Sequence, residues 1–76
     1  MVDRAALLDI LRDVCPDLDF EHETSLIDDG LLESLDIVSI VNGIIDEFDI
    51  EINVDDLLPE NFNSLEAMLA LIESKL

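Results

Sequence analysis

The sequence predicts an all-α fold, a small antiparallel bundle of three main helices and one short helix. Apolar residues recur at the i, i+3, i+4, i+7 spacing of helices, without the alternation that strands require. The chain has 76 residues, enough for one hydrophobic core and no more. Half of them are apolar, so the formal charge of −17 does not indicate disorder, which combines high charge with low hydrophobicity. We therefore expect residues 1–76 to form a single domain.

The first helix is expected to follow Asp3, whose side chain can cap the free N–H groups of the first turn. Pro16 ends this helix, because a proline ring steers the residue before it away from the helical region. One apolar stripe at helical spacing is predicted to be buried, formed by Leu7, Ile10, Leu11 and Val14.

Residues 16–33 form a long connection for so small a domain. Such a connection normally has a function or packs as an ordered loop. Apolar residues are spaced along it, namely Phe20, Leu26, Ile27, Leu31 and Leu32. We therefore expect an ordered loop whose apolar side chains pack on the core.

The second helix is predicted from Ser34 to Phe48. Leu35 lies nearly opposite its apolar stripe and Val38 lies at the stripe's edge, so neither belongs to the centre of the core face. The stripe is centred on Ile37, Val41, Ile44 and Phe48, with Ile40 and Ile45 widening it on either side. The remaining surface is expected to face water and carries Asp36, Ser39, Asn42, Asp46 and Glu47.

A short helical turn is expected over residues 55–61, opened by two aspartates, and Pro59 within it limits it to one or two turns. The last helix is expected to start at Asn63, whose side chain can accept from the N–H of Glu66. The Glu66 side chain would reach back, as in a capping box. The inward stripe of this helix consists of Leu65, Met68, Leu69, Ile72 and Leu76.

Charge and composition exclude several classes of protein. Twenty Asp and Glu against three Lys and Arg repel nucleic-acid backbones and anionic membrane surfaces, so we expect no nucleic-acid partner. No apolar run approaches the roughly 20 residues that span a bilayer, and Asp3 and Arg4 stand where a signal segment would begin. The single cysteine cannot form an internal disulfide, which favours a reducing, cytoplasmic setting.

The same counts argue against a metal centre and against an enzyme. One His and one Cys cannot assemble the usual zinc ligand sets. A buried catalytic pocket needs more chain than this, and no second His is present to act as a base. A calcium loop aligned on Gly30 would put Ile27 at a ligand position and Asp36 where a glutamate should close the loop. Only loose binding of divalent cations by the clustered acids is left open.

The informative segment is GLLESLDIVSIV, residues 30–41. Ser34 stands at the start of a helix, where its hydroxyl lies at the positive end of the helix dipole and can be reached from solvent. A phosphate bonded to that oxygen would be stabilised by free backbone N–H groups. A serine at this place is usually a simple N-cap. What favours a functional role is Leu35, an apolar side chain on the wet face beside several acids.

The chain resembles the acyl and peptidyl carrier proteins over nearly all of its length. The residues that carry the resemblance are in three stretches. GLLESLDIVSIV matches the family's acid-Ser-Leu attachment motif and the helix behind it, and EFDIEI, residues 47–52, is similar to the end of that helix. NFNSLEAM, residues 61–68, is similar to the short third helix and the capped fourth. An acid-Ser-Leu tripeptide alone is weak evidence, but the three stretches stand in register.

The resemblance implies that Ser34 receives 4′-phosphopantetheine from coenzyme A through a separate phosphopantetheinyl transferase. The terminal thiol would hold an acyl or aminoacyl group as a thioester, which makes the protein a carried substrate and not a catalyst. Its partners would be a loading ligase and downstream enzymes with basic patches, which it visits as a monomer. The residues expected to contact the arm or these partners are Glu33, Leu35, Asp36, Val38 and Asp46.

Three positions depart from the family's pattern. Glu33 precedes the serine where the family usually has Asp, which keeps the charge but moves it by one methylene. Ser39 and Asn42 replace a common acid and a bulky apolar residue, so the set of partners is expected to differ from that of fatty-acid carriers. The cargo stays open between fatty-acyl, polyketide, aminoacyl and D-alanyl groups, with a slight preference for a specialised pathway. Whether it folds between the helices is also open.

A second hypothesis is an acidic helical adaptor that binds partners non-covalently through Leu35 and Val38. It predicts that Ser34→Ala leaves function intact, whereas the carrier hypothesis predicts complete loss. The acidic surface is compatible with both, because it can steer the protein toward basic patches or serve solubility alone.

Three further residues are interpreted structurally. Cys15 is expected to be a small packed hydrophobe, although its place beside Pro16 allows exposure. His22 is expected to be a solvated loop residue. Gly43 lowers the stability of a helix by about 1 kcal/mol relative to alanine, which suggests a close contact with a residue of another segment that the sequence does not identify.

Overall fold

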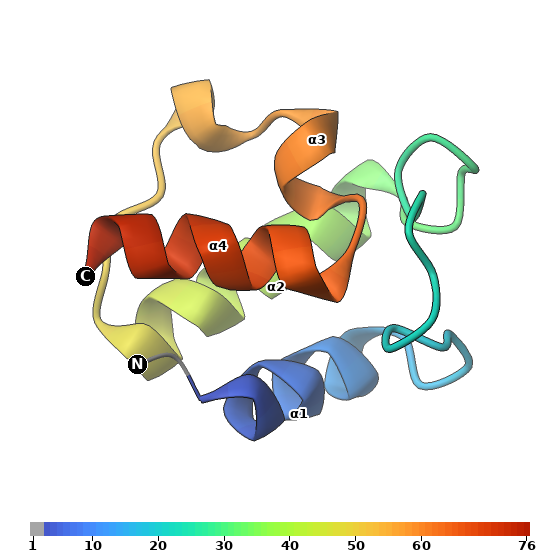
Figure 1. Ribbon diagram of the computed structural model, residues 1–76, viewed down its shortest axis with the longest axis horizontal. Coiled ribbons are helices and arrows are strands. Elements are labelled where there is room, and N and C mark those ends of the chain that lie inside the picture. The colour runs from blue at the N-terminus through green and yellow to red at the C-terminus, as the bar shows by residue number, and fades with distance from the viewer. Residues whose placement is uncertain (1–2) are drawn as a thin grey trace.

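The computed structural model describes residues 3–76, which form four α-helices and one 3-10 turn and contain no strand (Figure 1). The three main helices are α1 (Arg4–Val14), α2 (Ser34–Phe48) and α4 (Leu65–Lys75). The short helix is α3 (Pro59–Phe62), preceded by the 3-10 turn η1 (Val54–Asp56). The predicted all-α architecture of three main helices and one short helix is confirmed.

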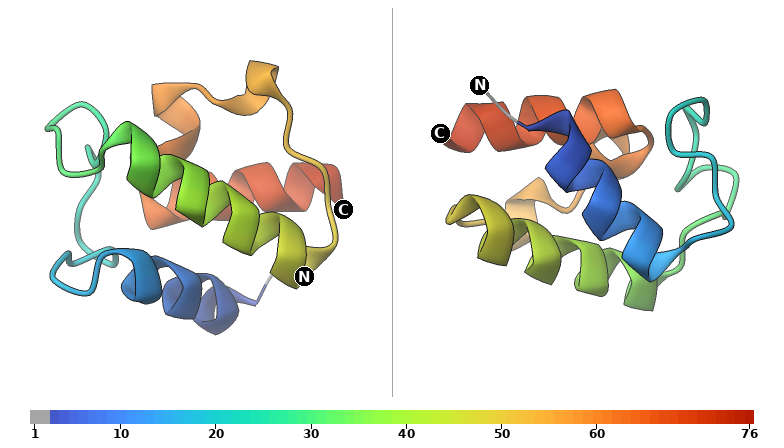
Figure 2. Two further views of the ribbon diagram at one scale, coloured as in Figure 1. Left: turned by 180° about the vertical axis from the view of Figure 1, so that it is seen from behind. Right: turned by 90° about the horizontal axis from the view of Figure 1, so that it is seen from below.

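Helix α1 packs against both α2 and α4, and α3 packs against α4. Figures 1 and 2 show that α1 runs in the opposite sense to α2 and α4, whereas α2 and α4 run in the same general sense. The segment between α2 and α4 carries the chain back across the molecule before α4 begins. As a result the first turn of α2 and the loop before it lie at the end of the molecule opposite the last residue of α4 (Figure 1).

The core is apolar and draws on every α-helix and on both long connections. Within residues 3–76 no polar or charged side chain is buried. The radius of gyration of 11.0 Å is about that of a compact chain of this length. The buried residues are Leu7, Leu8, Leu11, Phe20, Leu26, Leu32, Ile40, Ile44, Ile50, Phe62, Leu65, Met68, Leu71 and Ile72. Three of them belong to the connection 16–33, which confirms that it packs as an ordered loop.

Both ends of α1 are as predicted. The Asp3 carboxylate accepts hydrogen bonds from the backbone N–H groups of Ala5 and Ala6, at 3.0 and 3.3 Å. At the other end Cys15 leaves the helical region, and its N–H still donates to the carbonyl of Leu11. The proline that follows therefore ends the helix at the expected place.

Helix α2 has the predicted bounds, but its most deeply buried residues are Ile40 and Ile44. Ile37, Val41 and Phe48, which were expected with Ile44 at the centre of the stripe, are only half-buried. The apolar arc of this helix is wide, so periodicity identifies the face but not its deepest line. That line is set by where the neighbouring helices pack.

The segment 55–61, expected to form one short turn, is two elements. Leu58 is extended and separates η1 from α3, and Pro59 is the first residue of α3. Proline suits that position because the N–H it lacks would have no helical acceptor there. Pro59 thus begins a helix instead of limiting one.

The predicted start of α4 is wrong by one residue. Ser64 is the N-cap, and its hydroxyl accepts from the N–H of Ala67 at 3.1 Å. Asn63 keeps helical backbone angles at the end of α3, so its side chain cannot cap α4. Glu66 pairs with Arg4 of α1 instead of reaching back to a capping box. At the far end Leu76 is 68% exposed, contrary to the expected stripe.

Leu71 is buried, although it was not expected in the inward stripe. It lies in the fourth helix at a position outside the predicted stripe, which shows that this helix buries a broader face than the spacing alone indicates. Among residues 3–76 the structure contains no helix with the length and apolar character needed to cross a membrane.

Candidate functional site

Ser34 is the first residue of α2, and its side chain is exposed. The start of α2, in green, lies at the same end of the molecule as the 16–33 loop (Figure 2). The N-cap is Glu33, so Ser34 does not serve as the cap. The first helical hydrogen bond runs from the N–H of Ile37 to the carbonyl of Glu33, at 3.0 Å. The N–H groups of Ser34 and Leu35 precede that bond and have no acceptor within the helix. The hydroxyl therefore lies beside free donors at the positive end of a 15-residue helix.

The loop before Ser34 is closed on itself by backbone hydrogen bonds. The carbonyl of Leu26 accepts from the N–H groups of both Leu31 and Leu32, at 2.9 and 3.1 Å. Gly30, between Leu26 and Leu31, has a φ of +72°, a left-handed value that a residue with a side chain adopts only under strain. Nothing would touch a Cβ at that position, so backbone conformation and not space explains the glycine. The turn brings the chain back to the start of α2.

Asn63, at the end of α3, fastens this loop from outside. Its side-chain carbonyl accepts from the N–H groups of Ile27 and Asp28, at 3.0 and 3.1 Å, and its amide donates to the Asp28 carboxylate at 3.2 Å. Its backbone carbonyl accepts from the N–H of Leu26 at 2.8 Å. Sequence reasoning missed this role, because no local pattern connects residues 35 or more positions apart.

Four of the five predicted contact residues lie in the first two turns of α2 or just before it. Leu35 is 78% exposed and Val38 is 55% exposed, so two apolar side chains face solvent near Ser34. Asp36 is half-buried, and its carboxylate accepts from the N–H of Glu33 at 3.1 Å. The exposure of Leu35 and Val38 agrees with the helical pattern, whereas Asp36, which was expected to face water, is partly covered.

Asp46 is exposed but does not belong to this group. It lies eight residues beyond Val38 in the same helix, which is about 12 Å along the axis at 1.5 Å per residue. A partner would have to cover most of α2 to touch Ser34 and Asp46 together. Ser39 and Asn42, two of the three positions that depart from the carrier-protein pattern, are exposed and lie between Val38 and Asp46 in the helix.

An apolar cleft opens beside the second turn of α2. Its volume is about 110 Å³, enough for several water molecules. Ile37 forms one wall, Ile27 of the loop another, and the rest is contributed by the η1–α3 region. The lining residues are Ile27, Ile37, Leu57, Leu58, Pro59 and Phe62. The sequence did not indicate this cleft, because its walls come from three separate segments.

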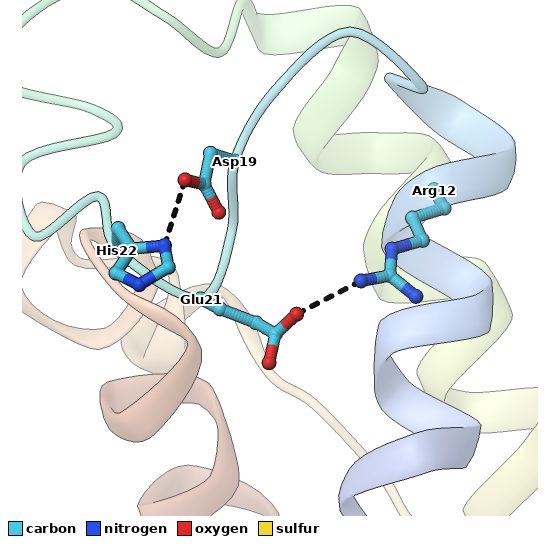
Figure 3. Close-up of polar contacts among 4 residues, drawn as sticks. All are labelled: Arg12, Asp19, Glu21 and His22. Atoms are coloured by element: carbon cyan, nitrogen blue, oxygen red, sulfur yellow. Dashed lines mark hydrogen bonds and ion pairs between the residues drawn. The ribbon is translucent and has the colours of Figure 1, made fainter.

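The surface around the site is strongly acidic, and each of the three cations is already paired. Arg4 of α1 pairs with Glu66 of α4, and Arg12 of α1 pairs with Glu21 of the loop at 3.0 Å (Figure 3). Lys75 of α4 pairs with an acid of η1 at 2.6 Å. Each ion pair joins two different segments, and pairing of the few positive charges leaves an acidic exterior.

His22 is exposed, as predicted, and one of its ring nitrogens lies 2.7 Å from the Asp19 carboxylate (Figure 3). Both side chains are open to solvent, so the pair contributes little to stability. Within the described part of the chain, no three His, Cys, Asp or Glu side chains are grouped so that they could hold a metal ion.

Cys15 is half-buried against the core at the end of α1. Burial raises the pKa of its thiol, and the nearby carboxylate of Asp36 raises that pKa further. The thiol therefore stays protonated and weakly nucleophilic near neutral pH. This agrees with the interpretation of Cys15 as a packed residue.

No protein-family model matches the chain, and the comparisons with curated proteins and with solved structures found no significant match.

Proposed function

We propose that this protein is a carrier that holds an acyl or aminoacyl group on a 4′-phosphopantetheine arm attached to Ser34. The observation that carries the proposal is the exposed hydroxyl of Ser34 at the first position of α2, relieved of capping by Glu33. Free backbone N–H groups at a helix N-terminus suit a phosphate, so the residues present fit a phosphodiester at this oxygen. When attached, such an arm supplies a terminal thiol that forms a thioester with the cargo.

In this function the protein itself would provide the attachment point for the arm and present the cargo to other enzymes. Ser34 would give up its hydroxyl proton and form the new oxygen–phosphorus bond, while the nucleotide portion of coenzyme A leaves. The exposed side chains of Leu35 and Val38 offer apolar contacts to the modifying transferase and to the enzymes that load and unload the cargo. The acidic exterior favours partners with basic patches and fast, short-lived encounters. We propose that it acts in the cytoplasm as a monomer, without catalytic activity of its own.

The decisive experiment is the intact mass after incubation with coenzyme A, Mg²⁺ and a permissive phosphopantetheinyl transferase. We expect a gain of one phosphopantetheine arm in the unaltered protein and in Ser39→Ala, and no gain in Ser34→Ala. Ser39 is a matched control, because it is the other exposed serine of α2. No gain with several transferases would contradict the carrier function.

The exposed apolar side chains also support a second candidate, a non-covalent adaptor. Besides Leu35 and Val38, Leu57 and Leu58 of the cleft rim are each 44% exposed. For an adaptor, Leu35→Ala would abolish partner binding while Ser34→Ala would leave it intact. For a carrier, both variants should fail, the first in recognition and the second in attachment. Surface truncation at Leu35 should change the free energy of unfolding by no more than about 0.5 kcal/mol, so lost binding would not reflect unfolding.

A further inference from the structure

We infer that Asn63 is a positioning residue for Ser34: it anchors the loop that sets where α2 begins, and it thereby controls how readily Ser34 is modified. The inference rests on the proposed function for its readout at Ser34. Its structural half, the anchoring of the loop, stands on the hydrogen bonds of Asn63 alone.

Asn63 is unusually rich in hydrogen bonds to the loop. One residue makes four hydrogen bonds to three consecutive loop residues, Leu26, Ile27 and Asp28, with lengths between 2.8 and 3.2 Å. Both its backbone carbonyl and its side-chain amide take part. These bonds go to a segment far away in the chain and not to the helix that Asn63 ends. We therefore infer that the position of the loop depends on Asn63.

A path of hydrogen bonds leads from Asn63 toward Ser34. Asn63 accepts from the N–H of Leu26, and the carbonyl of Leu26 accepts from Leu31 and Leu32. Leu32 is buried at 5% exposure and stands two residues before Ser34. The start of α2 is thus tied to the end of α3 by two successive sets of backbone hydrogen bonds. The Asn63 side chain secures this path at the two residues after Leu26, and those are the bonds that Asn63→Ala removes.

The anchored loop fixes the position of Ser34. Glu33 and Ser34 are exposed, and the structure gives Ser34 no burial that would hold its side chain in place. A displacement of about 1 Å can lower the rate of a reaction by about a hundredfold when a catalytic site must meet a positioned group. Loosening the loop should therefore slow the transferase even when the protein remains folded.

The test compares Asn63→Ala with Ser64→Ala. Ser64 is the matched control, because it is the next residue and its loss also removes a side-chain acceptor, but its hydroxyl caps α4 and does not touch the loop. The denaturation midpoint of each variant is measured first, and conditions are chosen in which both variants are folded to the same fraction. The kcat and KM of the transferase for modification of Ser34 are then measured. We expect Asn63→Ala to lose at least about tenfold in kcat with little change in KM, and Ser64→Ala to retain the unaltered kcat. Equal kcat in Asn63→Ala and the unaltered protein, or an equal loss in Ser64→Ala, would overturn the inference.

Exchanging the amide and the carboxylate between residues 63 and 28 tests the pair by rescue. Asn63→Asp keeps an oxygen acceptor for the N–H groups of Ile27 and Asp28 but places a second carboxylate against Asp28. Adding Asp28→Asn restores the hydrogen bond, because the amide at residue 28 now donates to the carboxylate at residue 63. We expect Asn63→Asp to be slow and the double variant to recover most of the rate, whereas no recovery would contradict an anchor built on this pair.

Hydrogen exchange separates this inference from the proposed function. In Asn63→Ala the backbone amides of Ile27 and Asp28, which donate to the Asn63 side chain, should lose protection, while in Ser64→Ala they should keep it. If the unaltered protein is never modified, the carrier function fails, and this exchange pattern still supports or refutes the anchoring of the loop. Unchanged protection of these amides in Asn63→Ala overturns the inference whatever the transferase does.

Discussion

Cys15 lies half-buried where α1 ends, close to Asp36 in the first turn of α2. Burial and the neighbouring carboxylate both disfavour the thiolate and raise the pKa of the thiol. The Cys15 thiol is therefore a weak nucleophile near neutral pH, because only the thiolate reacts readily.

We therefore predict slow alkylation of Cys15. At about pH 7.5, below the ordinary thiol pKa, iodoacetamide should modify the folded protein more slowly than a free cysteine peptide. Asp36→Asn should speed the reaction, because it removes a negative charge that opposes ionisation. Intact mass against time measures both rates, with the urea-unfolded chain as the reference for an unhindered thiol. Alkylation of the folded protein at the rate of the unfolded chain would contradict the prediction.

At the scale of the elements, the contact between α1 and α2 depends on Gly43. A Cβ placed on this glycine would lie 2.7 Å from Cγ2 of Ile10, closer than real Cβ atoms approach. The close contact suggested by a glycine inside a helix is thus the approach of α1. Ile10 is β-branched, so its side chain has little freedom to turn away within a helix.

Gly43→Ala should consequently destabilise the protein despite the better helix propensity of alanine. The propensity gain is about 1 kcal/mol and overpacking costs about 1–3 kcal/mol, so we expect a net loss of about 1 kcal/mol in the free energy of unfolding. In the background of Ile10→Leu, which removes Cγ2, the same change should be neutral or stabilising. Urea denaturation of the four proteins measures this cycle, and additive effects would disprove the contact.

A second contact between elements joins η1 to α4. The Asp56 carboxylate accepts from Lys75 at 2.6 Å and from the N–H of Asn53 at 2.9 Å. The hydrogen bond from Lys75 is the main cause that lowers the pKa of Asp56, and the Asn53 N–H adds to it. The side-chain amide of Asn61 donates to the backbone carbonyl of Asp56 at 2.9 Å, so this residue also holds α3. One aspartate thereby fixes the segment that carries Leu57 and Leu58, the rim of the cleft.

This contact should be visible in the pH dependence of stability. A carboxyl group whose pKa is lowered by folding stabilises the fold above its unfolded pKa, and this contribution is lost as the pH falls through the folded pKa. We expect Lys75→Met to be less stable than the unaltered protein near neutral pH. The difference should shrink below the ordinary value of 3.8 and close once the pH has fallen through the lowered pKa of folded Asp56, because only then is Asp56 protonated in both proteins. Denaturation at neutral pH and at successively lower pH tests this, and a constant difference would contradict it.

At the scale of the whole molecule, the balance of charge dominates. The formal charge is −17 on a body of 28 × 25 × 19 Å. The Debye length is about 30 Å at 0.01 M salt, so every charge then acts on every other, and it shrinks to about 8 Å at 0.15 M. Salt weakens three ion pairs but screens the mutual repulsion of many more carboxylates. Repulsion outweighs attraction, because 20 acids face only three Lys and Arg.

We predict that the midpoint of thermal unfolding rises when NaCl is increased from about 0.01 to about 0.2 M. Relief of about 1 kcal/mol of repulsion would raise it by about 4–8 °C for a domain of this size. MgCl₂ at equal ionic strength should give a similar rise if screening alone acts, and a larger one if clustered acids bind the cation. Circular dichroism during heating records the midpoint. A midpoint that falls with added salt would show that the ion pairs outweigh the repulsion.

Features written in a continuous stretch of sequence could be predicted, and those that join distant stretches could not. Asp3 as a cap, Pro16 as a stop and Leu35 on the wet face each follow from neighbours within one or two helical turns. The cap of α4 was misassigned between Asn63 and Ser64, because both residue types are good caps and only the bonds of Asn63 to the loop decide between them. The anchoring role of Asn63 could not be predicted for the same reason, because its bonds join distant segments of the chain.

The helical class of this protein, its acidic character and the serine at the start of α2 could all be inferred from the amino-acid sequence. These features follow from period, composition and local capping, which need no knowledge of the partners across the core. The packed fold was needed to establish that Ile40 and Ile44 lie deepest, that Leu71 and not Leu76 is buried, and that Asn63 holds the loop before Ser34. A helical stripe specifies a direction, whereas burial and long-range hydrogen bonds depend on which segments meet there.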